Sequence, residues 1–231
     1  MKKVLVVAAT QFEIQPFIHF LSTEMRQKQS IVFRNYEFDV LITGVGMVNT
    51  ALKLTKRLMQ NKYDFALNAG IAGSFIGTKT TKNPPILRGA VVEIVSEQYG
   101  DLGVEEADGK FTDMFELGLI KPDEVPFKKC KLLNPNPLAL KALPKTSGLT
   151  VQKVHGFEPS IEAISKKYDC QIETMEGAAF FQTCLTEGVN FTAIRAISNF
   201  VESRNRDNWK MEEAIQNLNE VLVELFEKRL I

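Results

Sequence analysis

Short apolar segments alternate along the chain with longer amphipathic segments, which predicts strands alternating with helices. The first apolar run, residues 4–9, is continuous, as is typical of a strand covered on both faces. Strands are predicted at residues 4–9, 31–33, 36–43, 64–69, 90–95, 150–154, 171–174 and 191–197. Helices are predicted at residues 12–25, 48–58, 159–167, 176–187 and 208–229.

This order of elements predicts an α/β fold of three layers, in which a mixed, largely parallel central sheet is flanked by helices on both sides. With 231 residues and no repeat or linker, the chain is expected to form a single domain, residues 1–231. Residues 70–74 are rich in glycine and are predicted to form a loop after a strand. Residues 97–144 are less periodic, and we expect loops with short elements there.

Composition narrows the functional classes. The formal net charge is zero, which disfavours a nucleic-acid partner, and no apolar run is long enough to span a membrane. The basic start of the chain precedes an apolar run that is too short for a secretion signal, so a buried first strand is favoured. Three unpatterned cysteines and two histidines favour a cytoplasmic protein without a structural metal, and no cofactor is expected.

Polar residues follow the predicted strands at the edge where α/β sheets bind ligands. Glu13 follows the first strand, Glu176 follows the strand at 171–174, and Asn199 follows the last strand. We therefore expect these three side chains to lie in one buried pocket.

Each of these residues also has a purely structural interpretation. Glu13 and Glu176 suit the first turns of helices, where a carboxylate favours the helix dipole. Asn199 suits a turn, and Arg195 suits a structural salt bridge. A Gly-x-Gly sequence at residues 44–46 lacks the third glycine of a dinucleotide fingerprint, and the chain contains no Walker A sequence.

Four segments, taken together and in order, are similar to one known superfamily. They are Glu13 after the first strand, Asn-Ala-Gly-Ile-Ala-Gly at 68–73, Met-Glu-Gly-Ala-Ala at 175–179 and Arg-Ala-Ile-Ser-Asn at 195–199. This combination resembles the nucleoside phosphorylase and methylthioadenosine/S-adenosylhomocysteine nucleosidase superfamily. The resemblance covers most of the chain, is weakest between residues 97 and 147, and implies a nucleoside phosphorylase-like fold and cleavage of a bond between ribose and purine.

Longer stretches are similar to one branch, futalosine hydrolase. They are residues 68–75, 99–103 and 195–209. This resemblance implies hydrolysis of the N-glycosidic bond of futalosine, which releases hypoxanthine and dehypoxanthine futalosine in a route to menaquinone. Ser203 departs from an expected proline, and Ile71 departs from the serine usual in adenine-specific nucleosidases.

The resemblance also implies roles for individual residues. Glu13 would activate water, and Glu176 would bind the ribose hydroxyls while Met175 packs on the ribose. The purine would meet Ser198 and Asn199. The remaining residues of the implied substrate site are Ile71 on the glycine-rich segment, His155 and Phe157 beside the base or sugar, and Arg204 and Arg206 for the substrate carboxylate. The superfamily also implies a homo-oligomer, with a dimer favoured.

Asn199 bears on the identity of the base. Adenine-specific relatives use aspartate here, which can protonate N7 of the purine, whereas an amide cannot act as an acid. An amide can accept from N7–H and donate to O6 of a 6-oxopurine. With adenine, the same orientation sets two donors against each other, at a cost of about 1–3 kcal/mol. The sequence therefore favours hypoxanthine as the leaving base.

Three other functions stay open at this point. A phosphorylase would use phosphate instead of water, but no glycine-rich, arginine-containing phosphate loop lies between residues 9 and 33. A methylthioadenosine-type nucleosidase is disfavoured by Asn199 and Ile71. A non-catalytic nucleoside-binding module is disfavoured by the presence of both Glu13 and Glu176.

Overall fold

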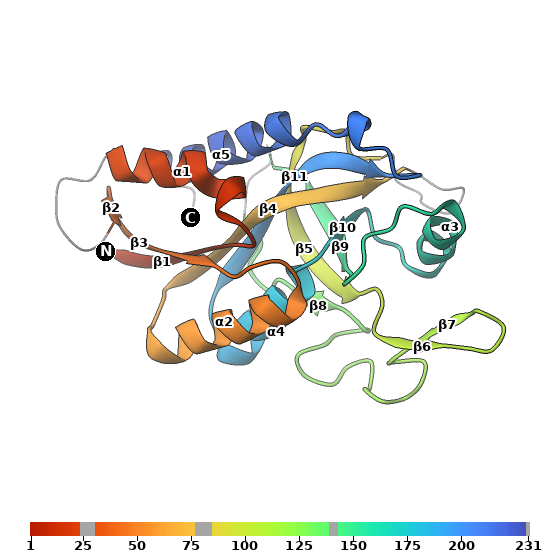
Figure 1. Ribbon diagram of the computed structural model, residues 1–231. Helices are drawn as coiled ribbons and strands as arrows, with labels where there is room; N and C mark the ends of the chain where they lie inside the picture. Colours follow the sequence, from red (N-terminus) through yellow and green to blue (C-terminus); the bar gives the residue numbers. More distant parts are fainter. Residues whose placement is uncertain (24–30, 77–84, 139–142, 230–231) are drawn as a thin grey trace.

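The computed structural model describes residues 1–23, 31–76, 85–138 and 143–229. In this part of the chain a mixed sheet of nine strands lies between two helical layers, as Figure 1 shows. The nine strands are β1 (Lys2–Ala8), β2 (Ile31–Phe33), β3 (Tyr36–Ile42), β4 (Phe65–Phe75), β5 (Val91–Tyr99), β8 (Leu132–Leu133), β9 (Lys145–Thr150), β10 (Ile172–Thr174) and β11 (Phe191–Val201). Their order is β10-β9-β5-β11-β4-β1-β3-β2, and β8 pairs with β5.

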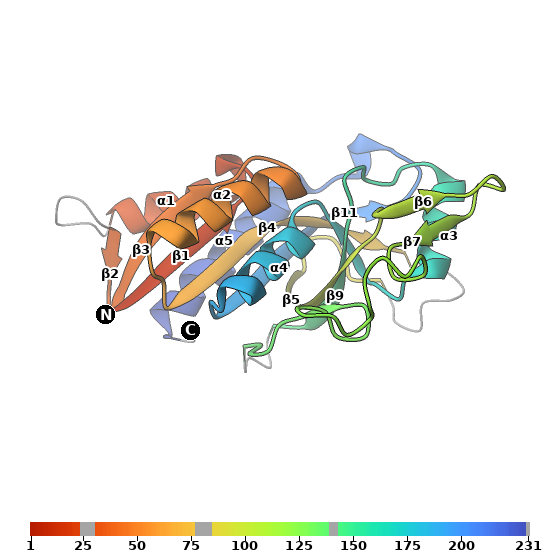
Figure 2. The same cartoon turned by 90° about the horizontal axis from the view of Figure 1, so that it is seen from below.

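Helices cover both faces of this sheet. The helices α1 (Gln11–Thr23) and α5 (Met211–Glu227) pack together on one face, and α2 (Met47–Gln60) and α4 (Gly177–Glu187) pack together on the other (Figures 1 and 2). The helix α3 (Glu158–Lys167) and the hairpin of β6 (Gly103–Glu105) and β7 (Phe111–Asp113) lie toward one end of the molecule. This arrangement confirms the predicted three-layer α/β fold.

The central strands and the flanking helices bury apolar residues in the pattern that their sequences predict. In β1, the five residues from Val4 to Ala8 are fully buried, because helices cover both faces of the strand. In α5, the buried positions recur every three or four residues and make one apolar stripe. Phe226 of that stripe stacks on Phe17 of α1 and meets Phe38 of β3 edge to face. These aromatic contacts fix α1 and α5 against the sheet.

Two predictions about strands were wrong. Residues 70–74 form no loop but continue β4, because β11 and β10 both form ladder hydrogen bonds with this stretch. The strand predicted at residues 150–154 lies earlier in the chain, as β9 (Lys145–Thr150). The predicted and observed ranges share only Thr150. The polar, glycine-containing sequence of β9 hides its strand character, which comes from its position between β5 and β10.

Other boundaries differ by a few residues. β5 and β11 each extend four residues past their predicted ends, so Asn199 lies inside a strand, next to an irregularity in the ladder with β4. A short 3₁₀ turn, η1 (Arg206–Asn208), contains the first residue of the predicted last helix, Asn208, and α5 itself begins at Met211. α1 ends at Thr23, and the rest of its predicted range lies outside the described residues. The short elements expected between residues 97 and 144 are present as β6, β7 and β8.

Candidate active site

Glu13 lies in the first turn of α1 and its carboxylate reaches the edge of the central sheet. Oε2 accepts hydrogen bonds from the backbone N–H of Thr10 at 2.9 Å and from its hydroxyl at 2.8 Å. This contact resembles the back-bonding glutamate of a capping box, so the structural interpretation of Glu13 is correct in part. The other oxygen, Oε1, accepts from the backbone N–H of Ile71 in β4 at 3.2 Å. The side chain is therefore fixed between a helix start and the predicted ligand-binding edge.

The absence of a side chain at Gly70 allows this approach. A Cβ atom built on Gly70 would lie 2.9 Å from Oε1 of Glu13 and 3.7 Å from Nε of Arg195. Arg195 is 1% exposed and binds the side chain of Asn68 as well as the backbone carbonyl groups of Asn68 and Ile194. Its Nε has no hydrogen-bond partner among the described residues. Because Gly70 has no side chain, the carboxylate of Glu13 and the buried guanidinium group of Arg195 can both lie close to β4.

Glu176 precedes α4, where its backbone is the N-cap, but its side chain does not cap that helix. Oε1 instead accepts from the backbone N–H of Gly46 at 2.9 Å, which joins the start of α4 to the start of α2. Burial raises the pKa of Glu176. The Gly46 hydrogen bond and the charge of Arg195 oppose that rise, and the negative charge of Glu13 adds to it. The charge of Glu13 therefore acts on the carboxyl group of Glu176.

Glu97, in β5, is a fully buried carboxyl group that the sequence did not reveal as part of this region. Its Oε2 accepts from the hydroxyl of Thr150 at 2.8 Å, and its Oε1 accepts from Thr174 at 3.4 Å. A Cβ atom at Gly177, the first residue of α4, would overlap Oε1 of Glu97. Burial raises the pKa of Glu97 to about 7, the nearby Arg195 lowers it, and Glu176 raises it. Glu97 therefore supports the turn that carries Glu176.

The last strand places Ser198 and Asn199 beside the carboxyl half of β4. Ser198 is buried, and its hydroxyl donates to Oδ1 of Asn199 at 2.8 Å. Nδ2 of Asn199 donates to the backbone carbonyl of Phe200 at 2.9 Å. Asn199 pairs with Gly73, three strand residues beyond Gly70, and its Nδ2 would lie 3.1 Å from a Cβ atom built on Gly73.

Asn199 lines a small cavity of about 50 Å³. The lining residues include Asn199, His155, Arg204 and the buried Glu173 of β10, but neither Glu13 nor Glu176. Glu173 holds the ring of His155 through a hydrogen bond to Nδ1. His155 and Arg204 are among the residues predicted from the sequence, but Glu173 is not, because a glutamate within a predicted strand carries no signal of its partner.

The remaining predicted site residues are less enclosed. Met175 is half-buried between β10 and α4, and Ile71 is half-buried with its N–H on Glu13. Phe157 is 68% exposed just before α3, so the structure does not place it with the others. Arg206 is exposed and lies over the ring of Trp209, as does Arg204.

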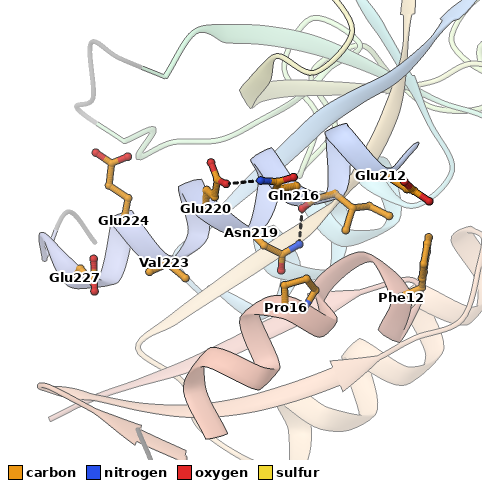
Figure 3. Close-up of a pocket in the computed structure, with 10 residues that line it drawn as sticks. Phe12, Pro16, Glu212, Gln216, Asn219, Glu220, Val223, Glu224 and Glu227 are labelled. Carbon is orange, nitrogen blue, oxygen red and sulfur yellow. Dashed lines mark hydrogen bonds between the residues drawn. The ribbon is translucent and has the colours of Figure 1, made fainter. Parts of the chain in front are cut away.

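A separate groove runs between α1 and α5, lined by Phe12, Pro16 and several residues of α5 (Figure 3). Four of those α5 residues are glutamates: Glu212, Glu220, Glu224 and Glu227. Asn219 lies at its floor with its amide directed toward α1, where it binds the backbone of Glu13 and Phe17. The groove contains none of the predicted site residues.

Among the described residues, no group of three or more His, Cys, Asp or Glu side chains could hold a metal ion.

This arrangement can support the hydrolysis of an N-glycosidic bond. An ionised carboxylate offers about four acceptor positions, and three donors occupy those of Glu13. The fourth position can receive a water molecule and take its proton. Glu176 can accept from hydroxyl groups, and Asn199 offers both an acceptor and a donor to the polar edge of a base.

In the described ranges, no helix is both long and apolar enough to cross a membrane.

Comparison with curated proteins finds relatives with two activities. The chain is 30% identical to the futalosine hydrolase of Thermus thermophilus over 193 residues, which cover 78% of this chain and 77% of the relative. It is 29% identical to the futalosine hydrolase of Streptomyces coelicolor over 81% of this chain and 78% of the relative. A 5′-methylthioadenosine/S-adenosylhomocysteine nucleosidase of Maridesulfovibrio salexigens is 30% identical over 71% of this chain and 69% of its own length. No protein-family model matches the chain.

Solved structures share the fold at lower identity. The native futalosine hydrolase of Helicobacter pylori matches with a TM-score of 0.75 and 16% identity, over 98% of each chain. An S-adenosylhomocysteine nucleosidase of Streptococcus pyogenes, in complex with 5-methylthiotubericidin, matches with a TM-score of 0.77 and 18% identity, over 98% of this chain and 97% of that one. With the curated relatives, these matches show that the chain is an N-glycosyl hydrolase of the nucleoside phosphorylase and methylthioadenosine/S-adenosylhomocysteine nucleosidase superfamily, most like its futalosine hydrolases.

Proposed function

We propose that the protein hydrolyses the N-glycosidic bond of futalosine and releases hypoxanthine. The amide of Asn199 carries the assignment of the base, because it can accept from N7–H and donate to O6. Glu13 takes the proton of the attacking water and favours the positive charge that develops on the ribose. Glu176 accepts hydrogen bonds from the ribose hydroxyls, and Met175 packs on the sugar.

The decisive experiment measures base release from four nucleosides: futalosine, its 6-amino analogue, inosine and methylthioadenosine. Each is incubated with the protein, with and without inorganic phosphate, and the released base is identified by chromatography. We expect hypoxanthine from futalosine at a rate that phosphate does not change. A requirement for phosphate would indicate a phosphorylase and would contradict this proposal.

A methylthioadenosine-type nucleosidase is the second candidate, because the Maridesulfovibrio salexigens relative is also 30% identical. Adenine released from methylthioadenosine faster than hypoxanthine from futalosine would favour it. Asn199 and Ile71 argue against this alternative, since adenine-specific members of the superfamily use aspartate and serine at these positions.

Futalosine also carries a carboxylate, for which we propose Arg204 and Arg206 as the binding cations. Both guanidinium groups lie over Trp209, at 5.4 and 5.9 Å from the ring centroid, and Arg204 also lines the cavity of Asn199. We expect Arg204→Ala and Arg206→Ala to raise KM for futalosine more than KM for inosine, which lacks the carboxylate. Unchanged futalosine kinetics in both variants would exclude this role.

We also propose that the protein is a homodimer that associates through the outer face of α2. Three apolar side chains of this helix are strongly exposed in the single chain: Val48 at 71%, Leu52 at 67% and Met59 at 77%. Contiguous exposed apolar surface of this kind is typical of an association surface. Light scattering should give twice the chain mass, and Leu52→Glu should give the single-chain mass; a monomeric wild-type protein would exclude a dimer.

We also propose that the protein is located in the cytoplasm. Cys130, Cys170 and Cys184 are all free thiols, and Cys170 and Cys184 are buried. Unpaired cysteines are typical of a reducing compartment. Fractionation of cells should find the protein with cytoplasmic markers, and recovery in an extracytoplasmic fraction would contradict this location.

A further inference from the structure

The proposed reaction needs a proton for the departing base, and Asn199 cannot supply it. When the glycosidic bond breaks, its electron pair moves to the purine, and protonation at N7 stabilises the leaving group. The amide of Asn199 can stabilise N7–H once it exists, but it cannot act as the acid. The general acid must therefore be a different group near the same edge of the base.

Four ionisable side chains line the cavity that contains Asn199: His155, Glu173, Glu202 and Arg204. A guanidinium group keeps its proton in proteins, which excludes Arg204 as a donor of protons. Glu202 is half-buried and accepts an exposed hydrogen bond from the side chain of Asn208 at 3.0 Å. Glu173 is 4% exposed and directs both carboxylate oxygens at His155. These contacts leave His155 as the group best suited to transfer a proton.

Glu173 fixes both the position and the tautomer of His155. Its Oε1 accepts from the backbone N–H of His155 at 3.0 Å, and its Oε2 pairs with Nδ1 of the ring. Because a carboxylate accepts, Nδ1 carries a proton, and Nε2 is the ring nitrogen that remains for a ligand. The side chain of His155 is 10% exposed, so the ring is largely enclosed beside this partner.

The segment that carries His155 is tied to the segment that follows Asn199. The backbone N–H of Arg204 donates to the carbonyl of Gly156 at 3.1 Å, and the hydroxyl of Ser203 donates to Glu158 at 3.2 Å. These two contacts hold one wall of the cavity against the other. His155 and Asn199 thus belong to one connected structure and not to two loops that happen to lie nearby.

We propose that His155, oriented by Glu173, is the general acid that protonates the departing purine; this inference rests on the proposed function. The C1′–N9 bond breaks with its electrons moving to the purine, and the proton on Nε2 of the imidazolium moves to N7. Water adds to C1′ and gives its proton to Glu13. After product release His155 regains a proton from solvent and Glu13 loses one, so charge and atoms balance. Glu173 acts through His155 and is a positioning residue.

The test compares a substrate that needs the proton with one that does not. Futalosine needs it, whereas N7-methylated futalosine is already cationic and its base departs uncharged. For His155→Gln we expect kcat with futalosine to fall by about 10²- to 10⁴-fold, the usual contribution of a general acid. We expect its kcat with the N7-methyl compound to stay within about tenfold of wild type, since no acid is required. Glu173→Gln should show the same selectivity with a smaller loss.

His19→Gln is the matched control, because the other histidine of the chain is exposed on α1. Thermal unfolding of each variant separates loss of fold from loss of chemistry. Equal losses on both substrates in folded His155→Gln, or no loss on either, would overturn the proposal. If the wild-type protein cleaves methylthioadenosine in place of futalosine, the proposed function fails, but methylthioadenosine and its N7-methyl derivative still decide the role of His155.

Discussion

Nδ2 of Asn199 donates to the backbone carbonyl oxygen of Phe200 at 2.9 Å, and this contact fixes which way the amide faces. A carbonyl oxygen only accepts, so turning the amide over would set two oxygens against each other. The hydroxyl of Ser198 donates to Oδ1 at 2.8 Å, which agrees with the same orientation. Each amide atom keeps one further hydrogen-bonding position for a base. The amide is therefore prepared for a 6-oxopurine without rearrangement.

Replacing this amide should change the preferred base. In Asn199→Asp, a carboxyl oxygen replaces the amide N–H that faces the backbone carbonyl oxygen of Phe200. Two facing oxygens favour protonation of the carboxyl group, which can then donate a hydrogen bond. We expect the ratio of kcat/KM for futalosine to that for its 6-amino analogue to fall by about 10- to 100-fold, corresponding to about 1–3 kcal/mol. Asn61→Asp, at the end of α2, is the control. An unchanged ratio in Asn199→Asp would show that this amide does not select the base.

Glu13 should matter for the chemical step more than for substrate binding. Its carboxylate is held by Thr10 and Ile71 with one acceptor position left, as a group that activates water requires. For Glu13→Gln we expect kcat to fall by about 10²- to 10⁴-fold while KM changes little. Glu212→Gln, an exposed glutamate in the first turn of α5, should leave both constants at their wild-type values. Activity within tenfold of wild type in Glu13→Gln would exclude the role.

The sequence predicts the layers of this fold well, because β1 and α5 have strong hydrophobic patterns that survive in the structure. It also draws attention to Glu13, Glu176 and Asn199, because polar residues at strand ends are expected to meet at one edge of a parallel sheet. Asn199 lines a cavity that neither Glu13 nor Glu176 lines, so their single shared pocket stays a prediction. It fails where long-range pairing decides the conformation. Residues 70–74 resemble a turn by composition, but strands on both sides draw them into β4.

Two buried carboxyl groups were missed for a similar reason. Glu97 and Glu173 lie inside strands, and nothing within a few residues of either identifies its partners. The Thr150 hydroxyl on Glu97 is 53 residues away, and His155 is 18 residues from Glu173. Such pairs become recognisable only when the sheet brings the strands together, because a glutamate in a strand is otherwise expected to face solvent.

The buried carboxyl of Glu97 should make folding stability depend on pH. Burial raises its pKa from 4.5 to about 7. A carboxyl group with a higher pKa in the folded state favours folding fully below about pH 4.5, and this contribution is lost as the pH rises through about 7. The difference corresponds to about 3 kcal/mol. Glutamine does not titrate, so Glu97→Gln lacks this dependence.

Denaturant unfolding of wild type and Glu97→Gln at pH 4 and pH 8 checks this prediction. The free energy of unfolding of the variant, relative to wild type, should rise by about 3 kcal/mol between the two pH values. Glu227→Gln, exposed at the end of α5, should show no such rise. A difference that does not vary with pH would mean that Glu97 titrates normally in the folded protein.

Asn219 should position Glu13 from the opposite helix. Its Nδ2 donates to the carbonyl of Glu13 at 2.9 Å, and its Oδ1 accepts from the N–H of Phe17 at 2.9 Å. These are the two backbone groups that an uninterrupted α-helix would join to each other. Pro16 lies between them and adds no N–H of its own. The side chain of a residue in α5 therefore completes the first turns of α1. Figure 3 shows Asn219 beside Pro16, between the two helices.

In Asn219→Ala these two backbone groups lose a buried partner, which should lower the free energy of unfolding by about 2 kcal/mol. Because the first turn of α1 carries Glu13, kcat should fall by about tenfold or more even under conditions where the variant is fully folded. Gln216→Ala removes only an exposed contact with Glu220 one turn away, and it should change neither quantity. A variant that loses stability but keeps the wild-type kcat would show that α1 holds Glu13 without help from α5.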